Sequence, residues 1–317
     1  MTPAGDPGRL EGIVTQKSSR DVRVETSQGL LSCSLRGRFR LGEGARSPVV
    51  VGDRVEISRV AEAEGVLERI FPRRTEVTRA TAGGKPMVVA ANMDRLLIVL
   101  AARDPPPRWA LVDRMLVSAH RDSLEPAIAL NKWDQAEDSP SHAEALEKVL
   151  ALYRSLGYPA YCLSSLHGSG VDKVIGWLQG KATVLSGHSG VGKSTLLNIL
   201  DPSLSLQTGE VNVVTGKGRH ITTAVRLFKM PFGGYAADTP GFREFQPAAL
   251  SPEELSRHYP ELLKVMGGCR YKDCLHRSEP SCAVQEAVQR GDVSKMRYEN
   301  YLQILASLLE GGRSSSF

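Results

Sequence analysis

The chain has no long hydrophobic run and no recognisable secretion signal, and these absences exclude several classes of protein. Its longest clean apolar run, LLIVLAA at residues 96–102, is far too short to cross a membrane as a helix. The opening MTPAGDPGRLEG contains no apolar core of the kind that signal peptides carry. We therefore expect a cytoplasmic protein that does not associate with membranes.

Cysteine is also scarce, and its count of five is odd. Three of the five, Cys269, Cys274 and Cys282, fall within fourteen residues. In a reducing compartment such clustering favours a metal site over disulfides. Cys33 and Cys162 lie in predicted strands, where we expect buried apolar residues rather than metal ligands.

The remaining composition is ordinary, with 41% hydrophobic and 24% charged residues among 317. This length allows two or three domains, each with its own core. The net charge of +5 favours an anionic partner, although an unremarkable basic enzyme would carry the same charge.

Residues 1–75 are predicted to form an all-β domain. Five short segments with strand character are separated by turn signals: EGIVTQ, DVRVET, GLLSCSL, GDRVEIS and GVLERI. This number suits an OB-fold barrel, a common binder of RNA and single strands. In SLRGRFRL, Arg36, Arg38 and Arg40 alternate on one predicted strand face and are candidates for RNA contact. The alternative is a solvated outer face.

Residues 76–245 are predicted to form an α/β domain. Helical segments WALVDRMLVSAH and HAEALEKVLALYRSLG, the latter with Gly157 as a C-cap, alternate with apolar strands. The predicted strands cover 94–102, 126–131, 159–165 and 182–187. Such alternation predicts a mostly parallel sheet that binds ligands at the carboxyl ends of its strands.

GHSGVGKST fits the phosphate-binding pattern G-x-x-x-x-G-K-[ST], between a predicted strand and the predicted helix STLLNIL. Its glycines allow backbone N–H groups to point at the β-phosphate, while Lys193 bridges the β- and γ-phosphates and Ser194 ligates Mg²⁺. All residues of this loop are predicted to bind the nucleotide: Gly187, His188, Ser189, Gly190, Val191, Gly192, Lys193, Ser194 and Thr195.

The tetrapeptide NKWD predicts a preference for guanine. Asp134 can accept hydrogen bonds from guanine N1–H and the exocyclic amine, and adenine offers neither donor there. Asn131 can recognise the other edge of the base and stiffen the loop, and the stem of Lys132 can lie against the ring. Ser164 and Ser165, at the end of the next predicted strand, begin a turn whose N–H groups can reach guanine O6.

AADTPG supplies a third fragment, in which Asp238 is predicted to hold a Mg²⁺-bound water and the Gly241 amide to contact the γ-phosphate. Asp-x-Pro-Gly is also a common turn, but all three fragments follow strands of one predicted sheet. Their order is permuted, because the base loop precedes the phosphate loop. Circular permutation is feasible where the termini of a domain lie close together.

The water-orienting glutamine of Ras-type GTPases is absent, because Phe242 follows Gly241. A low intrinsic rate of hydrolysis is therefore expected. In the loop GKGRHITT, Thr222 or Thr223 can ligate Mg²⁺, and the sequence does not choose between them. His220 is the candidate catalytic residue that orients water once a partner orders the loop, although a lone loop histidine is often only solvated.

Residues 246–317 are predicted to form a helical zinc-binding domain, with a helix starting at SPEEL and an amphipathic helix in SKMRYENYLQILASLLEG. Three thiolates and one imidazole in C-x4-C-x-H-x5-C spacing form a closed tetrahedral set, which predicts one structural Zn²⁺. The predicted ligands are Cys269, Cys274, His276 and Cys282. The DTPG segment runs directly into this domain, so we expect γ-phosphate sensing to be coupled to its position.

These motifs resemble the RsgA family of small ribosomal subunit biogenesis GTPases, also called YjeQ or EngC. The resemblance covers nearly the whole chain: the OB-like domain, the permuted NKWD, GHSGVGKST and DTPG order, and the cysteine–histidine cluster. It implies hydrolysis of GTP to GDP and phosphate, stimulated by the small ribosomal subunit, and a role in late maturation of that subunit. It also implies contacts of the outer domains with ribosomal RNA or protein.

The resemblance further implies that the histidine matching His220 replaces the missing glutamine. Ile221 stands where members often have another threonine, which leaves the metal-ligand threonine open. We expect a monomeric GTPase that binds Mg²⁺ with GTP and carries one Zn²⁺. The alternative is an RNA-binding module that uses GTP as a conformational switch with negligible turnover.

Overall fold

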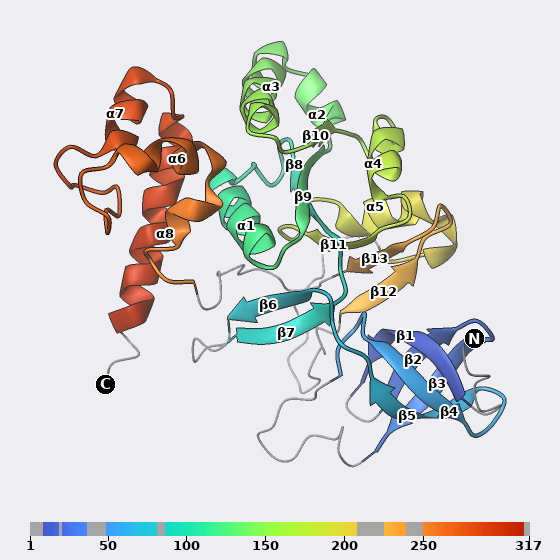
Figure 1. Cartoon of the computed structure of the whole chain (residues 1–317). Coiled ribbons are helices and arrows are strands. Elements are labelled where there is room, and N and C mark those ends of the chain that lie inside the picture. The colour runs from blue at the N-terminus through green and yellow to red at the C-terminus, as the bar shows by residue number, and fades with distance from the viewer. Residues whose placement is uncertain are drawn as a thin grey trace, which may run out of the picture.

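The computed structural model describes residues 9–18, 21–36, 49–80, 86–207, 225–238 and 250–313. Figure 1 shows a central α/β domain flanked by a β-barrel on one side and a helical module on the other. Eight residues singled out above lie outside the described residues: Arg38, Arg40, His220, Ile221, Thr222, Thr223, Gly241 and Phe242.

The N-terminal domain is a closed five-stranded barrel, as its pattern of short strands predicted. Its strands are β1 (Arg9–Lys17), β2 (Asp21–Thr26), β3 (Gly29–Leu35), β4 (Arg54–Arg59) and β5 (Glu64–Ile70). Antiparallel pairs β1–β2, β2–β3, β4–β5 and β1–β4, with parallel β3–β5, close the barrel. Alternating side chains fill its interior, among them the fully buried Cys33. Because β3 ends at Leu35, the prediction that Arg36 lies within a strand is wrong.

A hairpin not anticipated from the sequence connects the barrel to the central domain. It consists of β6 (Glu76–Ala80) and β7 (Pro86–Ala91), and an isolated bridge from Val51 to Ala90 ties it to the barrel. Asn92 also donates from Nδ2 to the carbonyl of Gly52 at 2.9 Å.

The central sheet is mostly parallel, in the order β10-β9-β8-β11-β13, with β12 antiparallel beside β13. Its strands are β8 (Arg95–Ala101), β9 (Glu125–Asn131), β10 (Ala160–Cys162), β11 (Ala182–Ser186), β12 (Arg226–Lys229) and β13 (Tyr235–Asp238). Strand β10 is shorter than the predicted 159–165, because the Ser164 N–H bonds to the Ser169 carbonyl in a turn.

Helices cover both faces of this sheet, as the alternation of strands and helices predicted. Along β8, Leu96 and Ile98 pack with α1 and α3, whereas Leu97 and Val99 pack with α4 and α5. The helices are α1 (Trp109–Arg121), α2 (Asp134–Glu137), α3 (Pro140–Ser155), α4 (Val171–Leu178) and α5 (Lys193–Leu200).

The C-terminal module contains η3 (Leu255–His258), α6 (Pro260–Val265), η4 (Met266–Gly268), α7 (Ala283–Arg290) and α8 (Lys295–Arg313). The predicted amphipathic helix is thus confirmed as α8. A regular helix does not begin at SPEEL: Ser251 and Glu254 form a hydrogen-bonded turn, and the α-helix starts at Pro260. Within the ranges described, no helix is both long and apolar enough to span a membrane.

Candidate nucleotide-binding site and metal centre

The permuted motifs meet at one edge of the central sheet. Asn131 ends β9, Ser164 follows β10, Gly187 follows β11 and Asp238 ends β13. These strands are parallel, so their carboxyl ends and the loops that follow them share one edge.

Asn131 directly connects three of these loops. Its side chain is 1% exposed, and Nδ2 donates to the carbonyl of Val191 in the phosphate loop at 2.8 Å. Its Oδ1 accepts from the backbone N–H of Ser165 at 2.9 Å. A Cβ on Gly192 would lie 2.3 Å from Nδ2, and the φ of +93° at Gly192 also favours glycine. Asn131 therefore stiffens the junction between the base loop and the phosphate loop.

The phosphate loop is curled around its own lysine. Lys193 Nζ donates to the carbonyls of Gly187 at 2.7 Å and His188 at 3.0 Å. Burial lowers the pKa of Lys193, while the nearby carboxylate of Asp238 opposes that shift. Ser194 and Thr195 lie in the first turn of α5, where backbone N–H groups and the helix dipole favour an anion. The arrangement fits a phosphate group, whose oxygens would replace the two carbonyls as partners of the ammonium.

The base loop presents an acceptor that no described residue satisfies. Oδ1 of Asp134 is buried and has no hydrogen-bond partner among the described residues, and the same holds for Oγ of Ser165. An ionised carboxylate only accepts hydrogen bonds, so a buried one needs donors from a ligand. The two adjacent N–H groups of guanine fit this requirement.

One part of the site was missed by the sequence analysis: the loop between β8 and α1. Lys132, with a φ of +58°, donates from Nζ to the carbonyl of Asp104 in this loop. Prolines 105–107 and Arg108 line a small cavity together with His188 of the phosphate loop. Three consecutive prolines between a strand and a helix were the available signal, because they stiffen a connection that otherwise reads as ordinary.

The cysteine–histidine cluster is assembled. The four ligand atoms of Cys269, Cys274, His276 and Cys282 lie within 4.8 Å of one another. His276 Nδ1 is 3.5 Å from the Sγ atoms of Cys269 and Cys282, which are 4.0 Å apart. A disulfide has sulfurs about 2 Å apart, whereas two thiolates at the tetrahedral Zn–S distance are about 3.8 Å apart. The cluster is consistent with zinc.

Groups around the cluster hold its turn in place. Tyr298 Oη donates to the His276 carbonyl at 2.7 Å, and Tyr301 Oη donates to the Leu275 carbonyl at 2.8 Å. The Glu279 carboxylate accepts from three backbone N–H groups of the turn. Burial acts in the opposite direction, yet these N–H groups lower the pKa of Glu279 to about 2. Such outer contacts orient metal ligands.

Of the predicted RNA-contact arginines, only Arg36 lies within the described residues. Its guanidinium pairs with Glu68 at 2.5 Å, and its side chain stays 56% exposed. The carboxylate reduces the positive charge that Arg36 offers to a phosphate backbone. Its role in RNA contact stays a prediction.

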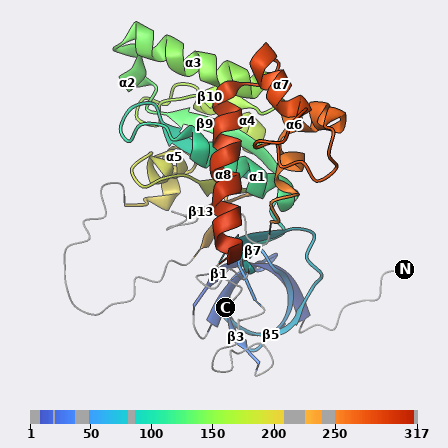
Figure 2. The same cartoon turned by 90° about the vertical axis from the view of Figure 1, so that its left-hand side faces the viewer.

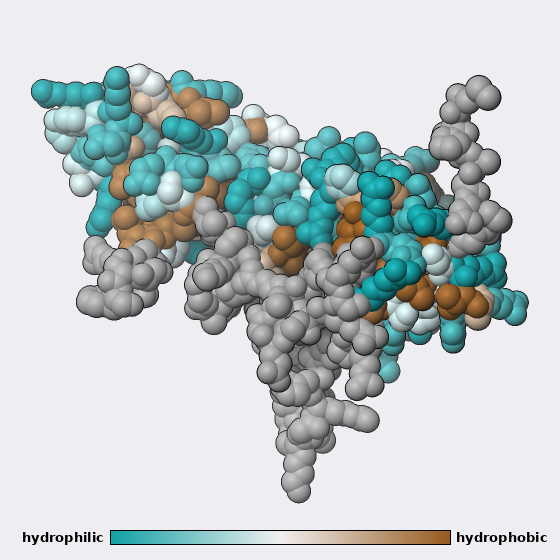
Figure 3. Space-filling view, turned by 60° about the horizontal axis from the view of Figure 1, so that its bottom comes forward, coloured by the Kyte–Doolittle hydropathy of each residue, from teal (hydrophilic) through white to brown (hydrophobic). Residues whose placement is uncertain are grey.

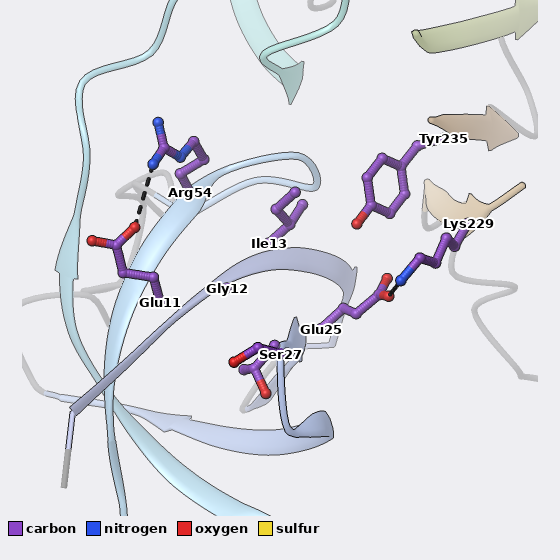
Figure 4. A pocket seen from close by; sticks show the side chains of 9 residues that line it. Glu11, Gly12, Ile13, Glu25, Ser27, Arg54, Lys229 and Tyr235 are labelled. Atoms are coloured by element: carbon purple, nitrogen blue, oxygen red, sulfur yellow. Dashed lines mark hydrogen bonds and ion pairs between the residues drawn. The ribbon is translucent and has the colours of Figure 1, made fainter. Parts of the chain in front are cut away.

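A larger cavity, of about 320 Å³, lies between the barrel and the β12–β13 edge (Figure 4). Glu25 pairs with Lys229 at 2.5 Å on one side, and Arg54 pairs with Glu11 at 3.3 Å on the other. Tyr235, which lines it, begins β13, whereas Asp238 ends that strand at the nucleotide edge. This cavity is therefore distinct from the nucleotide site.

The sequence of this chain is similar to the sequences of known proteins. The RsgA GTPase family profile matches residues 70–248. The chain is 41% identical over 307 residues to the small ribosomal subunit biogenesis GTPase RsgA of Moorella thermoacetica, covering 97% of this chain and 100% of that relative. Identity to the protein of the same name from Chlorobaculum tepidum is 40% over 313 residues, covering 95% and 99%.

Two solved structures are similar to this one. The crystal structure of YjeQ from Thermotoga maritima superposes with a TM-score of 0.76 at 33% identity, covering 95% of this chain and 99% of that one. YloQ, described as a circularly permuted GTPase, superposes with a TM-score of 0.73 at 29% identity, covering 95% and 96%. With its motifs in permuted order on one sheet edge, the chain belongs to the RsgA GTPase family.

Proposed function

We propose that this chain is a small ribosomal subunit biogenesis GTPase that binds the small subunit, is stimulated by it, and assists its late maturation. The names of its relatives support the role, and their similarity extends over nearly the full chain. The observation that carries the enzymatic part is the Asn131 side chain. It joins the base loop, the serine turn and the phosphate loop into one site.

In this proposal Asp134 accepts from guanine, the serine turn donates to guanine O6, and Lys193 binds the β- and γ-phosphates. Mg²⁺ bound with GTP supplies positive charge against the phosphate oxygens. Ser194 and either Thr222 or Thr223 would hold this ion, and Asp238 would hold a water bound to it. The Gly241 amide senses the γ-phosphate, and His220 orients the attacking water.

We assign the outer domains, 1–75 and 246–317, to contact with ribosomal RNA or protein, and 76–245 to nucleotide chemistry. Figure 3 shows separate apolar patches on both outer domains amid a hydrophilic surface. Among described large apolar residues, the exposed ones on these domains are Leu30, Val60, Leu263 and Tyr271. Apolar patches rimmed by polar residues suit macromolecular contact. One closed structural Zn²⁺ site, a monomeric state and a cytoplasmic location complete the proposal.

The first test is multiple-turnover GTP hydrolysis with and without purified small subunits. Because Phe242 cannot orient water, the rate alone should be low and should rise by orders of magnitude on the subunit. His220→Ala should bind nucleotide normally and lose the stimulation. Absence of stimulation in the parent protein would favour the RNA-binding module that only switches with GTP.

The second test concerns base choice. Asp134→Asn places an amide donor beside position 2 of the base, where xanthine carries a carbonyl and guanine an amine. The variant should lose GTP affinity and gain affinity for xanthosine triphosphate, measured by equilibrium competition against a fluorescent nucleotide. Unchanged base preference would remove Asp134 from the guanine site.

A further inference from the structure

A buried guanidinium joins the C-terminal module to the central domain. Arg297 of α8 is 1% exposed and binds Glu261 of α6 through Nε at 2.6 Å and Nη2 at 3.2 Å. Its Nη1 binds the Oδ1 of Asp113, which lies on α1 and is fully buried. Figure 2 shows α8 lying alongside α1, and the two helices are in contact.

Every charge in this network has partners. Asp113 also accepts from Tyr153 Oη of α3 and from Asn300 Nδ2 of α8, both at 2.7 Å. The ring centroid of Tyr259 lies 4.4 Å from Cζ of Arg297. Burial alone would lower the pKa of Arg297, but the carboxylates of Asp113 and Glu261 raise it overall, so the guanidinium stays charged. Since buried charges are costly unless fully paired, this network is satisfied in one arrangement of α1 and α8.

On the central-domain side, the network holds the helix that leads out of the nucleotide site. Asp113 lies one turn from the start of α1, and the loop before α1 contacts both nucleotide loops. The Asp104 carbonyl in that loop accepts from Lys132, and its prolines line a cavity with His188. A shift of α1 would therefore move the contacts of the base loop and the phosphate loop.

On the other side, the same helix α8 holds the metal cluster. Tyr298 and Tyr301 bind the carbonyls of the Leu275–His276 turn. The ring of Tyr301 also packs edge-on against Tyr259, with centroids 5.5 Å apart, and Tyr259 lies against Arg297. A continuous set of packed groups thus leads from the cluster to Asp113.

We infer that Arg297 is a positioning residue, which acts through Asp113 to couple the metal centre to the guanine-nucleotide loops. The inference rests on the proposed function, because it requires that those loops bind guanine nucleotides. Coupling between two sites is reciprocal, so a bound nucleotide must tighten zinc binding by the factor by which zinc tightens nucleotide binding. The proposed coupling runs through the base loop and the phosphate loop. GDP contacts both loops in the proposed site, so GDP should be sufficient to affect zinc binding.

The test is the equilibrium zinc affinity of the full-length, zinc-loaded protein, measured by competition with a chromogenic chelator at constant Mg²⁺. In the parent protein, saturating GDP should tighten zinc binding about fivefold or more, and a non-hydrolysable GTP analogue should do at least as much. In Arg297→Met the nucleotide effect should vanish. Arg297→Lys keeps the positive charge but not the planar fork, and should show reduced coupling in a folded protein.

The matched control is Arg290→Met on α7 of the same module, because Arg290 pairs with Asp292 where both side chains are more than half exposed. It should retain the full nucleotide effect. The nucleotide Kd of the zinc-loaded protein, measured by fluorescence, should rise in the Arg297 variants. It should rise by the same factor by which the zinc affinity of the nucleotide-bound protein falls, with guanine preference unchanged.

Three results would overturn the inference. The first is that the parent protein binds GDP but has the same zinc affinity with and without it. The second is full coupling in both Arg297 variants. The third is coupling with the GTP analogue alone, which would assign the effect to γ-phosphate sensing instead of α1. Absence of any nucleotide binding by the parent protein would instead contradict the proposed function itself.

Discussion

The C-terminal module meets the central domain across a buried ionic network, whereas the barrel meets the β12 edge of that domain through sparse backbone pairing and an exposed lysine. The Val51–Ala90 bridge is a further contact of the barrel, and Val51 packs in the central core. At the first junction Arg297, Asp113 and Glu261 are at most 6% exposed. At the second, one described bridge pairs Gln16 of β1 with Arg226 of β12, and Lys229, 65% exposed, reaches across to Glu25. The open cavity of Figure 4 lies between the same elements.

This difference indicates how freely each module can change its orientation relative to the central domain. A buried charge network specifies one orientation, because any other leaves carboxylates unpaired in the interior. Exposed ion pairs are screened by salt and contribute little to stability. We therefore expect the C-terminal module to move with the central domain and the barrel to change its orientation more easily.

The largest expected effect comes from breaking the buried junction. Arg297→Met leaves Asp113 and Glu261 buried without their cation, so the free energy of unfolding should fall by about 3–5 kcal/mol. Urea denaturation followed by tryptophan fluorescence would measure this. Arg290→Met is the control and should leave the curve in place. A loss of less than about 1 kcal/mol for Arg297→Met would contradict the proposed difference between the two junctions.

A smaller effect is expected at the root of the barrel. Asp53 is fully buried and accepts from the Val50 N–H and from Arg73 Nε, each at 2.7 Å. Asp53→Ala should cost about 2–3 kcal/mol, because it leaves a buried N–H and a partly buried guanidinium unpaired. Hydrogen exchange should localise the loss to the barrel. Equal loss of protection in the C-terminal module would show that the two ends are not independent.

The smallest effect is expected at the exposed junction. Lys229→Met removes the ion pair to Glu25 and should leave the denaturation midpoint unchanged at physiological salt, since the lysine of this pair is 65% exposed. Small-angle scattering should instead detect a broader range of barrel orientations in the variant. Raising the salt should produce the same broadening in the parent protein. A clear drop in stability would mean that this junction is stronger than its exposure indicates.

Many elements of the fold were predictable because their signals are local. Alternating apolar residues predicted the barrel strands, and three- and four-residue spacings predicted α1, α3 and α8. The hairpin β6–β7 was missed although the sequence offers the turn dipeptide Gly83–Gly84, because PMVVAA of β7 shows no alternation of polar and apolar residues. Strand β10 was overextended because small residues after Cys162 fit a strand as well as a turn.

The candidate site likewise contains parts that the sequence predicted and parts that it did not. Sequence motifs predicted the nucleotide loops but not the β8–α1 loop. Its contact with Lys132 uses the backbone carbonyl of Asp104, and its three prolines indicate only a stiff connection. The network around Arg297 was equally hidden. Asp113 and Arg297 lie in helical segments where a charged residue normally faces water.

The sequence by itself indicated which chemistry to expect: a motif typical of a phosphate loop, a tetrapeptide typical of guanine selection and four candidate metal ligands, each within a short stretch of the chain. Only the tertiary structure decided what these groups touch. Asn131 reaches Val191 across 60 positions, and Arg297 reaches Asp113 across 184. Burial and pairing at such separations depend on how strands and helices pack, and no short stretch of the chain contains that information.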